Sequence, residues 1–516
     1  MSAEYRESSP LTPTEQAIRR RKRVGCLAWI VLLVLIVLFV RSCFRGDERQ
    51  ATEEAHFKYG SIGSDIDNGL PIALLNVLPK MFPEHLPAGT QHLGDLRSFG
   101  FIVEPGMELP IGFSIRHQGI RLAGLNCGSC HTGVVRDVAT SPGKQILGMP
   151  ANQLRLQEFF GFLFNCVSDP RFSVDAVLQE MRQHGHRFLP GEETLYRQVV
   201  IPQFRGQLLL RSLQIGPIFA EEHPSWGAGR VDTFNPYKYI QFSEYYRDGV
   251  PLDERIGTSD FPSLWNQGIR EGMELHWDGN NASVFERNLS ASFGAGATRD
   301  SVDLASIERI QKWMADLPPP RFEDYFGWKI DTEKAARGRT IYQTYCFDCH
   351  DPNGKQVGTV DDLADVKTSP YRLNSYTEEL ARLQLAYGQG YSWQWKHFKK
   401  TTGYANMPLD GIWARAPYLH NGSVPTMWDL LTRQEERSKE PFFRGHGVID
   451  PERLGIQTDV EFYGPQNFPA WKFVVFDKTS QSYVPGNANQ GHTGERYGTE
   501  LSDEEKWDLI EFLKTL

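Results

Sequence analysis

A short pattern of two cysteines and a histidine occurs twice and constrains this chain more than any other feature. The copies are residues 127–131 (CGSCH) and residues 346–350 (CFDCH). The spacing C-x-x-C-H is typical of c-type haem attachment. Each thiol forms a thioether with one haem vinyl group, and the next histidine supplies the proximal imidazole to iron. The sequence therefore predicts two covalently bound haem c groups, attached through Cys127, Cys130, Cys346 and Cys349, with His131 and His350 as iron ligands.

Two other readings of a C-x-x-C pair fit this chain less well. Such a pair can be half of a zinc site or a thioredoxin-like redox pair. A structural zinc site needs four Cys or His ligands in close clusters. Here the two pairs lie far apart, each has its own histidine, and neither lies in a thioredoxin-like βαβ context. The haem interpretation is therefore preferred.

Length and charge set the broad class of the protein. The chain has 516 residues, which suggests two or three domains, and 40% hydrophobic residues, which allows a sizeable core. The formal net charge is -9. An acidic chain does not attract the phosphate backbone, so we expect no nucleic-acid partner.

The N-terminal region carries the pattern of a membrane anchor. A basic block, residues 19–23, precedes an uninterrupted apolar run over residues 24–40. The run is just long enough to span a bilayer as one helix, and the basic block predicts a cytoplasmic N terminus. No small-x-small cleavage site follows, so an uncleaved anchor is favoured over a cleaved signal peptide. The prediction is a single-pass inner-membrane protein whose C-terminal part lies in the periplasm, where bacteria attach c-type haem.

The expected fold class is mainly α, because no strong strand alternation is visible. It consists of two cytochrome c-like haem domains with long loop and helical insertions, preceded by one N-terminal transmembrane helix. Residues 331–338 predict a helix leading into the second motif, and residues 501–513 predict a terminal helix with a capping box from Ser502 to Glu505. The predicted domains are a cytoplasmic N terminus (1–23), a transmembrane anchor (24–40), a periplasmic tether (41–75), an N-terminal haem domain with an insertion (76–320) and a C-terminal cytochrome c domain (321–516).

Three further segments support a family resemblance. Residues 276–281 (HWDGNN) resemble the Trp-Asp-Gly segment between the haems of di-haem cytochrome c peroxidases and MauG. Residues 408–425, which contain PYLHNGSVP, resemble the Pro-Tyr-x-His-Asn/Asp-Gly loop of that superfamily, and in detail they are closest to RoxA-like (rubber oxygenase-like) di-haem cytochromes. The tail, residues 491–502, is also similar to RoxA-like proteins. The resemblance implies a two-haem oxidoreductase.

The sixth position of each iron decides what that iron does. Two strong axial ligands suit electron transfer, whereas an open position can bind peroxide or O2. For the second haem, the resemblance implies His492 as the distal ligand, and Met407 is the alternative because of its spacing from His350. We favour His492. No similarly convincing ligand follows His131, since Met149 is better explained as a core residue. The first iron is therefore expected to be the reactive one.

Three residues are candidates for catalysis. The resemblance implies that Trp277 relays electrons between the haems, although a tryptophan beside an Asp-Gly turn can also be core. Glu286 is placed to carry protons in a peroxidase, yet it also completes a capping pattern with Ser283. Phe293 shields the distal face of the first haem in the RoxA-like reading, and ordinary packing is the alternative. Arg415 is a candidate partner for a haem propionate through its guanidinium fork, and a surface salt bridge is the alternative.

These observations combine into one functional prediction. The chain is expected to be a membrane-anchored periplasmic di-haem c-type cytochrome, either a haem peroxidase or a RoxA-like dioxygenase. It would activate H2O2 or O2 at the first haem and transfer electrons through the second. The expected partners are H2O2 or O2, a small periplasmic electron-donor protein and the inner membrane. The alternative is a non-catalytic di-haem electron-transfer cytochrome. Related peroxidases bind Ca2+, and loop carbonyls could supply its ligands here.

Overall fold

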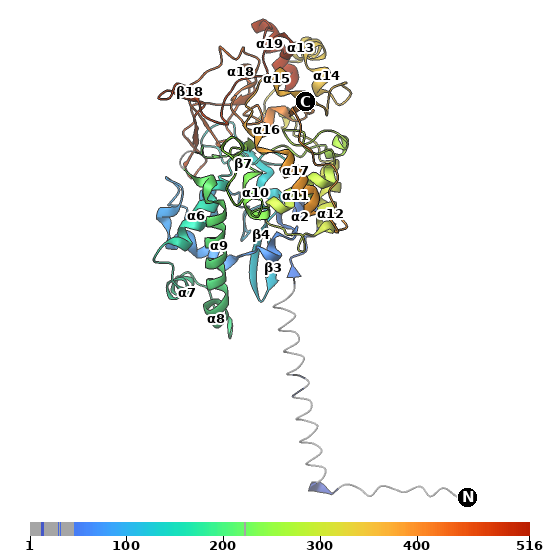
Figure 1. Cartoon of the computed structure of the whole chain (residues 1–516). Coiled ribbons are helices and arrows are strands. Elements are labelled where there is room, and N and C mark those ends of the chain that lie inside the picture. The colour runs from blue at the N-terminus through green and yellow to red at the C-terminus, as the bar shows by residue number, and fades with distance from the viewer. Residues whose placement is uncertain (1–11, 15–28, 30, 32–45, 221–222) are drawn as a thin grey trace, which may run out of the picture.

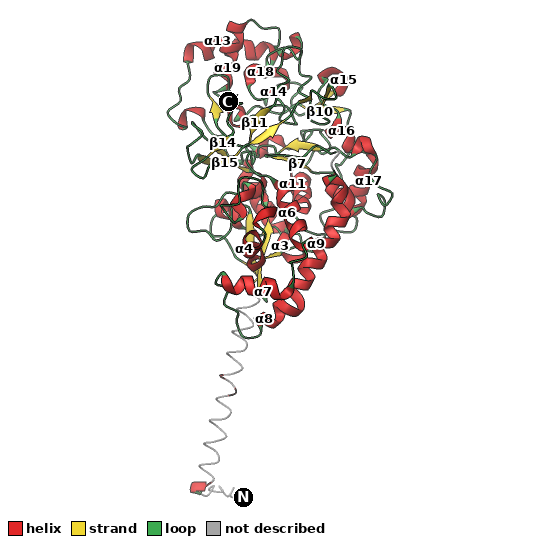
Figure 2. Ribbon diagram, turned by 90° about the vertical axis from the view of Figure 1, so that its left-hand side faces the viewer, coloured by secondary structure: helices red, strands yellow, loops and turns green. Residues whose placement is uncertain are grey.

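The computed structural model describes residues 12–14, 29, 31, 46–220 and 223–516 (Figure 1). Helices, short strands and long loops make up this part (Figure 2). The sheet strands β3 and β4 and the helices α7 and α8 lie towards one end of the molecule, and helices α13 and α19 lie at the other. The two C-x-x-C-H motifs belong to these two different parts.

The bounds of the elements show how short most of them are. The helices are α2 (Glu53–Tyr59), α3 (Ser64–Asp67), α4 (Ile72–Met81), α5 (Cys127–Cys130), α6 (Leu156–Ser168), α7 (Val174–Gln183), α8 (Glu192–Leu195), α9 (Ile201–Ile215), α10 (Asn235–Gln241), α11 (Val284–Gly294), α12 (Leu304–Ala315), α13 (Thr332–Tyr345), α14 (Phe347–His350), α15 (Leu363–Val366), α16 (Tyr371–Ser375), α17 (Glu378–Tyr387), α18 (Met427–Leu430) and α19 (Asp503–Leu513). The strands are β1 (Gly46–Asp47), β2 (Leu70–Pro71), β3 (Phe113–Gln118), β4 (Ile120–Leu125), β5 (Thr132–Val135), β6 (Lys144–Leu147), β7 (Arg230–Asp232), β8 (Thr258–Asp260), β9 (Val360–Asp362), β10 (Gly403–Ala405), β11 (Phe442–Arg444), β12 (Ile449–Asp450), β13 (Gly455–Ile456), β14 (Phe462–Tyr463), β15 (Phe468–Pro469), β16 (Trp471–Phe473), β17 (Phe476–Asp477) and β18 (Ser482–Tyr483).

The first motif follows a four-stranded antiparallel sheet with the strand order β1-β3-β4-β2. Strands β3 and β4 form a hairpin that turns at Gly119, whose φ of 76° is one that glycine adopts without strain. A large apolar core lies beside this sheet. Helix α6 buries Phe159, Leu163 and Cys166 in it, at the three- and four-residue spacing of one helix face. Helix α5 therefore begins directly after a strand that is held in place by the sheet and its core.

The second motif lies in a small helical arrangement typical of cytochrome c. Helix α13 leads into α14, and the terminal helix α19 packs across α13. The predicted capping box at α19 is present, with Ser502 and Glu505 bonded to each other's backbone. The two long helices meet at Gly338, where an added Cβ would lie 1.9 Å from the carbonyl oxygen of Asp508. Only glycine allows this close approach.

The fold class predicted from the sequence, mainly α, was wrong. The protein is mixed α/β, with 39% helix and 12% strand, rather than mainly α. Most of the strands have two to four residues and form separate two-stranded antiparallel pairs, some between segments that lie far apart in the sequence. Such strands are too short to leave an alternating apolar pattern, and backbone pairing between loops is invisible in a sequence.

The prediction of a single-pass inner-membrane protein with a periplasmic C-terminal part is also corrected. Among the helices of residues 12–14, 29, 31, 46–220 and 223–516, none is long and apolar enough to cross a bilayer. The predicted span, residues 24–40, lies almost wholly outside these residues, so no described helix supports an anchor. The described part of the predicted tether is not extended either: Gly46 pairs with His117, and Phe57 of α2 is fully buried.

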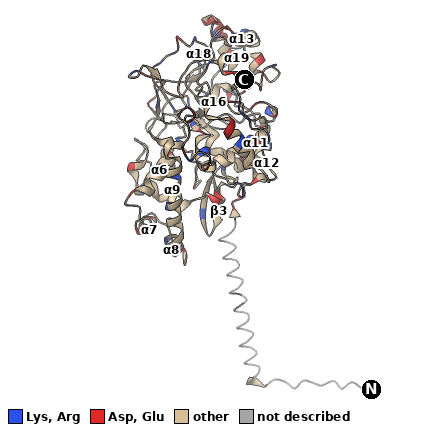
Figure 3. Ribbon diagram, in the orientation of Figure 1, with Lys and Arg blue, Asp and Glu red and all other residues tan. Residues whose placement is uncertain are grey.

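Several charged residues are buried where the two halves of the chain meet. Acidic and basic residues are interspersed along the ribbon of both halves (Figure 3). Arg444, which is 1% exposed, donates from Nη2 to Oδ1 of Asp260 at 2.9 Å and from Nη1 to the carbonyl oxygen of Gly422 at 3.1 Å. Residues on both sides of position 320 also share one apolar cluster, which includes Met149 and Trp265 with Trp413. The two halves are therefore joined by polar and apolar contacts.

Replacing Gly338 by alanine should lower the free energy of unfolding by about 1–3 kcal/mol, because the new methyl group forces α13 and α19 apart. Chemical denaturation of the purified protein measures this change. Gly206→Ala in α9 is the matched control, since nothing lies within 4 Å of the added Cβ and alanine favours the helix. Equal effects of the two substitutions would contradict the close packing of α13 on α19.

Candidate haem sites

The first motif is held at the start of a one-turn helix, α5. The side-chain oxygen of Asn126 accepts a hydrogen bond from the backbone of Gly128 at 2.9 Å and caps this helix. The Asn126 amide also donates to the carbonyl oxygen of Gly60 at 2.8 Å, which ties the motif to the segment after α2. The helix ends at His131, whose backbone N–H donates to the Cys127 carbonyl oxygen at 3.1 Å. The two thiols and the imidazole are thus fixed by local backbone contacts.

The imidazole of His131 is oriented by a backbone carbonyl. Its Nδ1 lies 2.9 Å from the carbonyl oxygen of Pro262, and because a carbonyl only accepts, Nδ1 carries the proton. Nε2 then keeps its lone pair, as a metal ligand requires. Burial, together with the positive charge of Arg287, lowers the pKa of His131 to about 3. The ring is therefore neutral at physiological pH.

The second motif repeats this arrangement in a different local structure. His350 ends α14, and its Nδ1 donates to the carbonyl oxygen of Met407 at 2.8 Å. Burial lowers the pKa of His350, so this imidazole is also neutral. The carbonyl oxygen of Met407 thus orients the ring of His350, as the carbonyl oxygen of Pro262 orients the ring of His131.

His492 faces His350 at the separation expected of two ligands on one metal. The two ring centroids are 6.3 Å apart and the rings are inclined by 38°. A metal bound to two imidazole nitrogens at about 2 Å each places the ring centres roughly 6.3 Å apart. His492 has a φ of 49°, a conformation that costs energy in a residue other than glycine. Arg437 holds this segment through hydrogen bonds to the carbonyl oxygens of Asn489, Gly491 and His492.

The geometry favours His492 over Met407 as the partner of His350. The Met407 carbonyl oxygen binds the rear edge of the His350 ring, so Met407 lies on the proximal side. Its sulfur is 3.7 Å from Nη1 of Arg270. Burial lowers the pKa of His492 to about 3, which keeps its ring neutral and able to bind metal.

The first site shows no such partner within the described part of the chain. The ring contact recorded there for His131 is with Phe261, at 6.3 Å and 70°, rather than with a second imidazole. Met149 is 1% exposed and belongs to an apolar cluster. The backbone N–H of Gly148, the residue before Met149, donates to the carbonyl oxygen of His131 at 2.8 Å. The two sites are therefore unequal.

A cavity lies between the two sites, and Trp277 lines it. Pro262 and Met407, which orient the two candidate proximal histidines, both line the same cavity. The indole Nε1 of Trp277 donates to the carbonyl oxygen of Asp260 at 2.8 Å, and its own carbonyl oxygen accepts from the backbone of Ala405 at 2.9 Å. These hydrogen bonds fix Trp277 in the cavity that Pro262 and Met407 also line, and its role as a relay stays a prediction.

Cationic side chains in this cavity fit the propionates of a haem. Arg270, Arg287 and Arg415 all line it. Arg270 and Arg415 both pair with Asp410, at 2.5 and 2.9 Å, but Nε of Arg415 is buried without a hydrogen-bond partner. Arg287 takes part in no ion pair among the residues that the structure describes, and burial lowers its pKa to about 10. Guanidinium groups suit bidentate binding of carboxylates such as propionates.

None of the four motif cysteines forms a disulfide within the described part of the chain, so all four thiols are available for thioether bonds. Burial raises the pKa of Cys127 to about 11 and that of Cys130 and Cys346 to about 12. Together with the neutral imidazoles and the arginine-lined cavity, these thiols fit covalently attached haem at both motifs.

Sequence reasoning missed His276. Its Nε2 is buried without a hydrogen-bond partner, its φ is 62°, and its ring lines the cavity beside Trp277. Burial lowers its pKa well below the usual range. The only sequence signal is its place next to Trp277, since neither the strained backbone nor the unpaired nitrogen can be read from a sequence.

Glu286 makes different contacts from those expected of a proton carrier. Its carboxylate accepts from the backbone of Lys396 and from Nδ1 of His397, both at 2.8 Å, and also from Asn281. Ser283 caps α11, but the Glu286 side chain does not return to it, so only half of the predicted capping box forms. Glu286 instead ties α11 to the loop that contains Lys396 and His397.

Phe293 lies in an aromatic cluster next to the first motif. It is 3% exposed and contacts Tyr387, Trp393 and Trp395 with ring centroids 5.2–5.7 Å apart. Cys127 packs against the same cluster. This placement fits a cover over the first haem, although packing also accounts for it.

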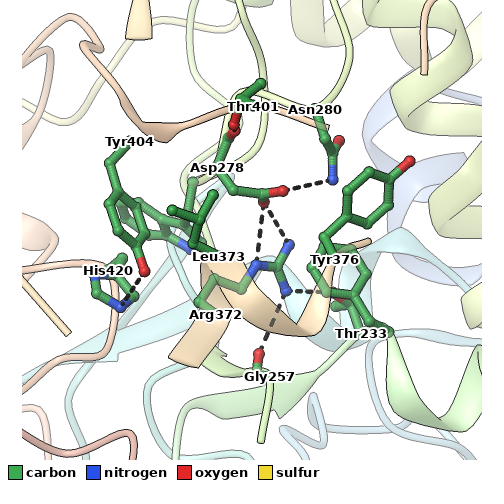
Figure 4. Close-up of polar contacts among 12 residues, drawn as sticks. Thr233, Gly257, Asp278, Asn280, Arg372, Leu373, Tyr376, Thr401, Tyr404 and His420 are labelled. Atoms are coloured by element: carbon green, nitrogen blue, oxygen red, sulfur yellow. Dashed lines mark hydrogen bonds and ion pairs between the residues drawn. The ribbon is translucent and has the colours of Figure 1, made fainter. Parts of the chain in front are cut away.

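A buried ion pair fixes the segment that contains Trp277 (Figure 4). Asp278 and Arg372 are 3.2 Å apart and 1–2% exposed. Arg372 also donates to Oγ1 of Thr233 at 2.5 Å, and Asn280 donates to Asp278 at 2.9 Å. The guanidinium lies 3.7 Å above the ring of Phe234. Because Arg372 belongs to α16, this network ties the segment after Trp277 to the C-terminal half.

His420 stabilises the same region and has no direct contact with either motif among the bonds of the described chain. Its ring stacks on Tyr404 at 4.3 Å, and its Nε2 lies 3.3 Å from the Tyr404 hydroxyl. Figure 4 shows this contact between Tyr404 and His420. The Tyr404 hydroxyl also donates to the carbonyl oxygen of Ser369 at 2.6 Å. Tyr404 immediately precedes Ala405, the residue that binds the Trp277 backbone.

Within the residues that the structure describes, no cluster of side chains requires Ca2+. In the described part, one group with metal-ligand spacing consists of Glu84, His85 and Asp169. Arg171 pairs with both carboxylates, so a cation is already supplied by the protein. Ca2+ therefore stays a prediction of the sequence.

Comparison with known proteins identifies the loop that supports the second site. Residues 403–443 match the family "RoxA-like, cytochrome c-like". The match covers a short segment of the chain and supports its similarity to RoxA-like cytochromes. This segment includes Met407, which orients His350, as well as Arg415 and His420. A cytochrome c-like domain implies covalently bound haem c, and RoxA-like cytochromes are oxygenase-type enzymes. The wider resemblance to di-haem peroxidases and MauG is not confirmed.

Two proteins of Sinorhizobium fredii (strain NBRC 101917 / NGR234) are similar over long stretches. The uncharacterized protein y4iM is 27% identical over 294 residues, which is 50% of this chain and 64% of that protein. The uncharacterized protein y4iJ is 25% identical over 523 residues, or 84% of this chain and 82% of that protein. The similarity to y4iJ extends far beyond the RoxA-like segment.

Replacing His492 by alanine should convert the second haem of the holoprotein from low spin to high spin, because its iron loses one imidazole. Met407→Leu should leave the low-spin signal in place, because the backbone carbonyl that binds His350 is retained. Electron paramagnetic resonance of the two ferric variants measures the outcome. A low-spin signal that survives in His492→Ala and disappears in Met407→Leu would reverse the assignment.

Replacing Arg372 by methionine should lower the free energy of unfolding by about 3–5 kcal/mol, because it leaves the buried carboxylate of Asp278 unpaired. Adding Asp278→Asn to this variant should restore part of the loss. Denaturant titration measures both. Arg382→Met is the control, since Arg382 pairs with Glu379 at the surface and its loss should leave the unfolding midpoint unchanged.

Proposed function

We propose that this protein is a two-haem oxidoreductase that activates H2O2 or O2 at the haem attached to residues 127–131. The haem attached to residues 346–350 would transfer electrons. The observation that carries this proposal is the inequality of the two sites: His492 lies 6.3 Å from His350, whereas His131 has no imidazole opposite it among the described ring contacts. An iron with an accessible sixth position supplies binding of peroxide or O2, and one with two imidazoles supplies electron transfer.

The surrounding residues have distinct roles in this proposal. Pro262 and Met407 orient the two proximal imidazoles through their carbonyl oxygens. Trp277 lies between these supports and shortens the path of an electron from one site to the other. Phe293 covers the first site, and Glu286 positions the loop that contains Lys396 and His397 beside it.

Peroxidase and dioxygenase activity differ in their need for electrons. A peroxidase needs two external electrons for each H2O2, so a small electron-donor protein would be its partner. A RoxA-like dioxygenase incorporates O2 and needs no external electrons per turnover. Measuring reduced donor consumed per H2O2, against O2 uptake without donor, separates these two reactions.

One observation favours the alternative, a non-catalytic electron-transfer cytochrome. The unpaired Nε2 of His276 is a nitrogen base in the cavity between the sites. If His276 served as a strong sixth ligand, the first iron would be closed to peroxide and O2.

Adding H2O2 to the purified ferric holoprotein should change the absorbance of one haem out of two. The change should persist in the double variant Cys346→Ala/Cys349→Ala and disappear in Cys127→Ala/Cys130→Ala, because only the first site has an accessible iron. Stopped-flow absorbance and the pyridine haemochrome assay measure the change and the haem content. An absorbance that responds to neither peroxide nor carbon monoxide in any of these proteins would favour the electron-transfer alternative.

A further inference from the structure

A series of aromatic side chains leads from the first haem site towards the surface. We call Phe293, Trp395, Trp393 and Tyr391 the aromatic path. Phe293 contacts Trp393 at 5.2 Å and Trp395 at 5.3 Å between ring centroids. The two indoles are 5.4 Å apart, and Trp393 lies 5.0 Å from Tyr391. Each step is a direct ring contact, so the path has no gap.

The inner end of the path meets the first motif. Cys127 packs against the apolar cluster that contains Phe293, Trp393 and Trp395. Leu264 belongs to the same cluster and lies two residues after Pro262, which orients His131. The aromatic path therefore begins beside the residues that would hold the first haem.

The outer end is a tyrosine with a proton acceptor. The hydroxyl of Tyr391 donates to Oδ1 of Asp300 at 2.9 Å, near the surface. A phenol that loses an electron also releases its proton, and a carboxylate at hydrogen-bond distance can accept it. Asp300 thus makes Tyr391 the easiest ring on the path from which to remove an electron and a proton together.

A nearby cation favours Tyr391 over the neighbouring Tyr387. The guanidinium of Arg299 lies 4.9 Å from the ring centroid of Tyr387 and 5.8 Å from that of Tyr391. A positive charge opposes the loss of an electron from an adjacent ring, and the effect falls with distance. Trp393 also contacts Tyr391 directly, so the path need not pass through Tyr387.

Packing alone does not explain this composition. Nε1 of Trp395 is buried and has no hydrogen-bond partner among the described residues, which costs free energy that phenylalanine would avoid. Glu286 moreover fixes the loop between Trp395 and Phe398 through hydrogen bonds to two successive backbone N–H groups. The indoles are therefore held in place at some expense in stability.

We propose that Tyr391 is a surface oxidation site, from which electrons pass inward through Trp393 to the first haem site. This inference rests on the proposed function, with H2O2 as the oxidant. One H2O2 is reduced to two waters by two electrons and two protons. Each oxidation of Tyr391 removes one electron, which passes to Trp393, and one proton, which passes to Asp300. The resulting phenoxyl group takes a hydrogen atom from an external donor. The substrate class is a one-electron donor, such as a phenol, too bulky to enter the first site.

The test uses the full-length holoprotein with both haems attached. One equivalent of H2O2 is added, the sample is frozen within milliseconds, and electron paramagnetic resonance detects organic radicals. Tyr391→Phe should lose the tyrosyl signal, and Trp393→Phe should lose it as well. Asp300→Asn should reduce it. Tyr483→Phe is the matched control, because Tyr483 is also half-buried and contacts a phenylalanine ring, Phe476, at 5.4 Å in another part of the fold.

Each outcome separates the inference from the proposed function. A tyrosyl signal that persists in Tyr391→Phe overturns the inference. A wild-type protein whose first haem responds to peroxide without any organic radical also overturns it, and leaves the proposed function intact. A protein that does not respond to peroxide at all refutes both. Loss of the signal in Tyr391→Phe, with retention in Tyr483→Phe, supports the assignment.

Discussion

The hydrogen bond from Nδ1 of each motif histidine to a backbone carbonyl is the interaction on which the arrangement of both sites depends. It fixes the orientation of the ring, assigns its proton and leaves Nε2 free for iron. For His131 the carbonyl comes from Pro262, and for His350 from Met407. Both are distant in sequence from the histidines that they orient. The long segments that follow each motif are therefore part of the sites, because they contain the two residues whose carbonyl oxygens orient the histidines.

Buried charged residues between the two halves of the chain hold these segments in place. Trp277 accepts a backbone hydrogen bond from Ala405 and donates one to Asp260, while Asp278 pairs with Arg372. Two buried ions are costly unless further hydrogen bonds satisfy them, and here Thr233 and Asn280 provide those bonds. The pair of Asp278 and Arg372 adds little net stability when it forms, although removing one partner is costly, and its main effect is to fix where the segment lies. It holds one tryptophan between two sites that lie on different parts of the fold.

The sequence predicts the haem-attachment residues and the candidate axial ligands better than the residues that orient and surround them. The C-x-x-C-H motifs, the capping box at Ser502 and the pairing of His350 with His492 follow from spacing and resemblance, and the structure is compatible with each. The carbonyl of Pro262, the strained backbone of His276 and the hydrogen bonds of Glu286 do not follow, because they depend on contacts between distant segments. The mixed α/β character was missed for a related reason: strands of two to four residues form only when loops meet.

The central claim is that the two haem sites differ in their axial ligands. Electron paramagnetic resonance of the resting ferric holoprotein, with spin quantitation against total haem, tests it most directly. The account predicts one low-spin haem, held by His350 and His492, and one high-spin haem of equal amount at His131. Two low-spin haems in equal amounts, neither of them altered by an added ligand, would contradict it.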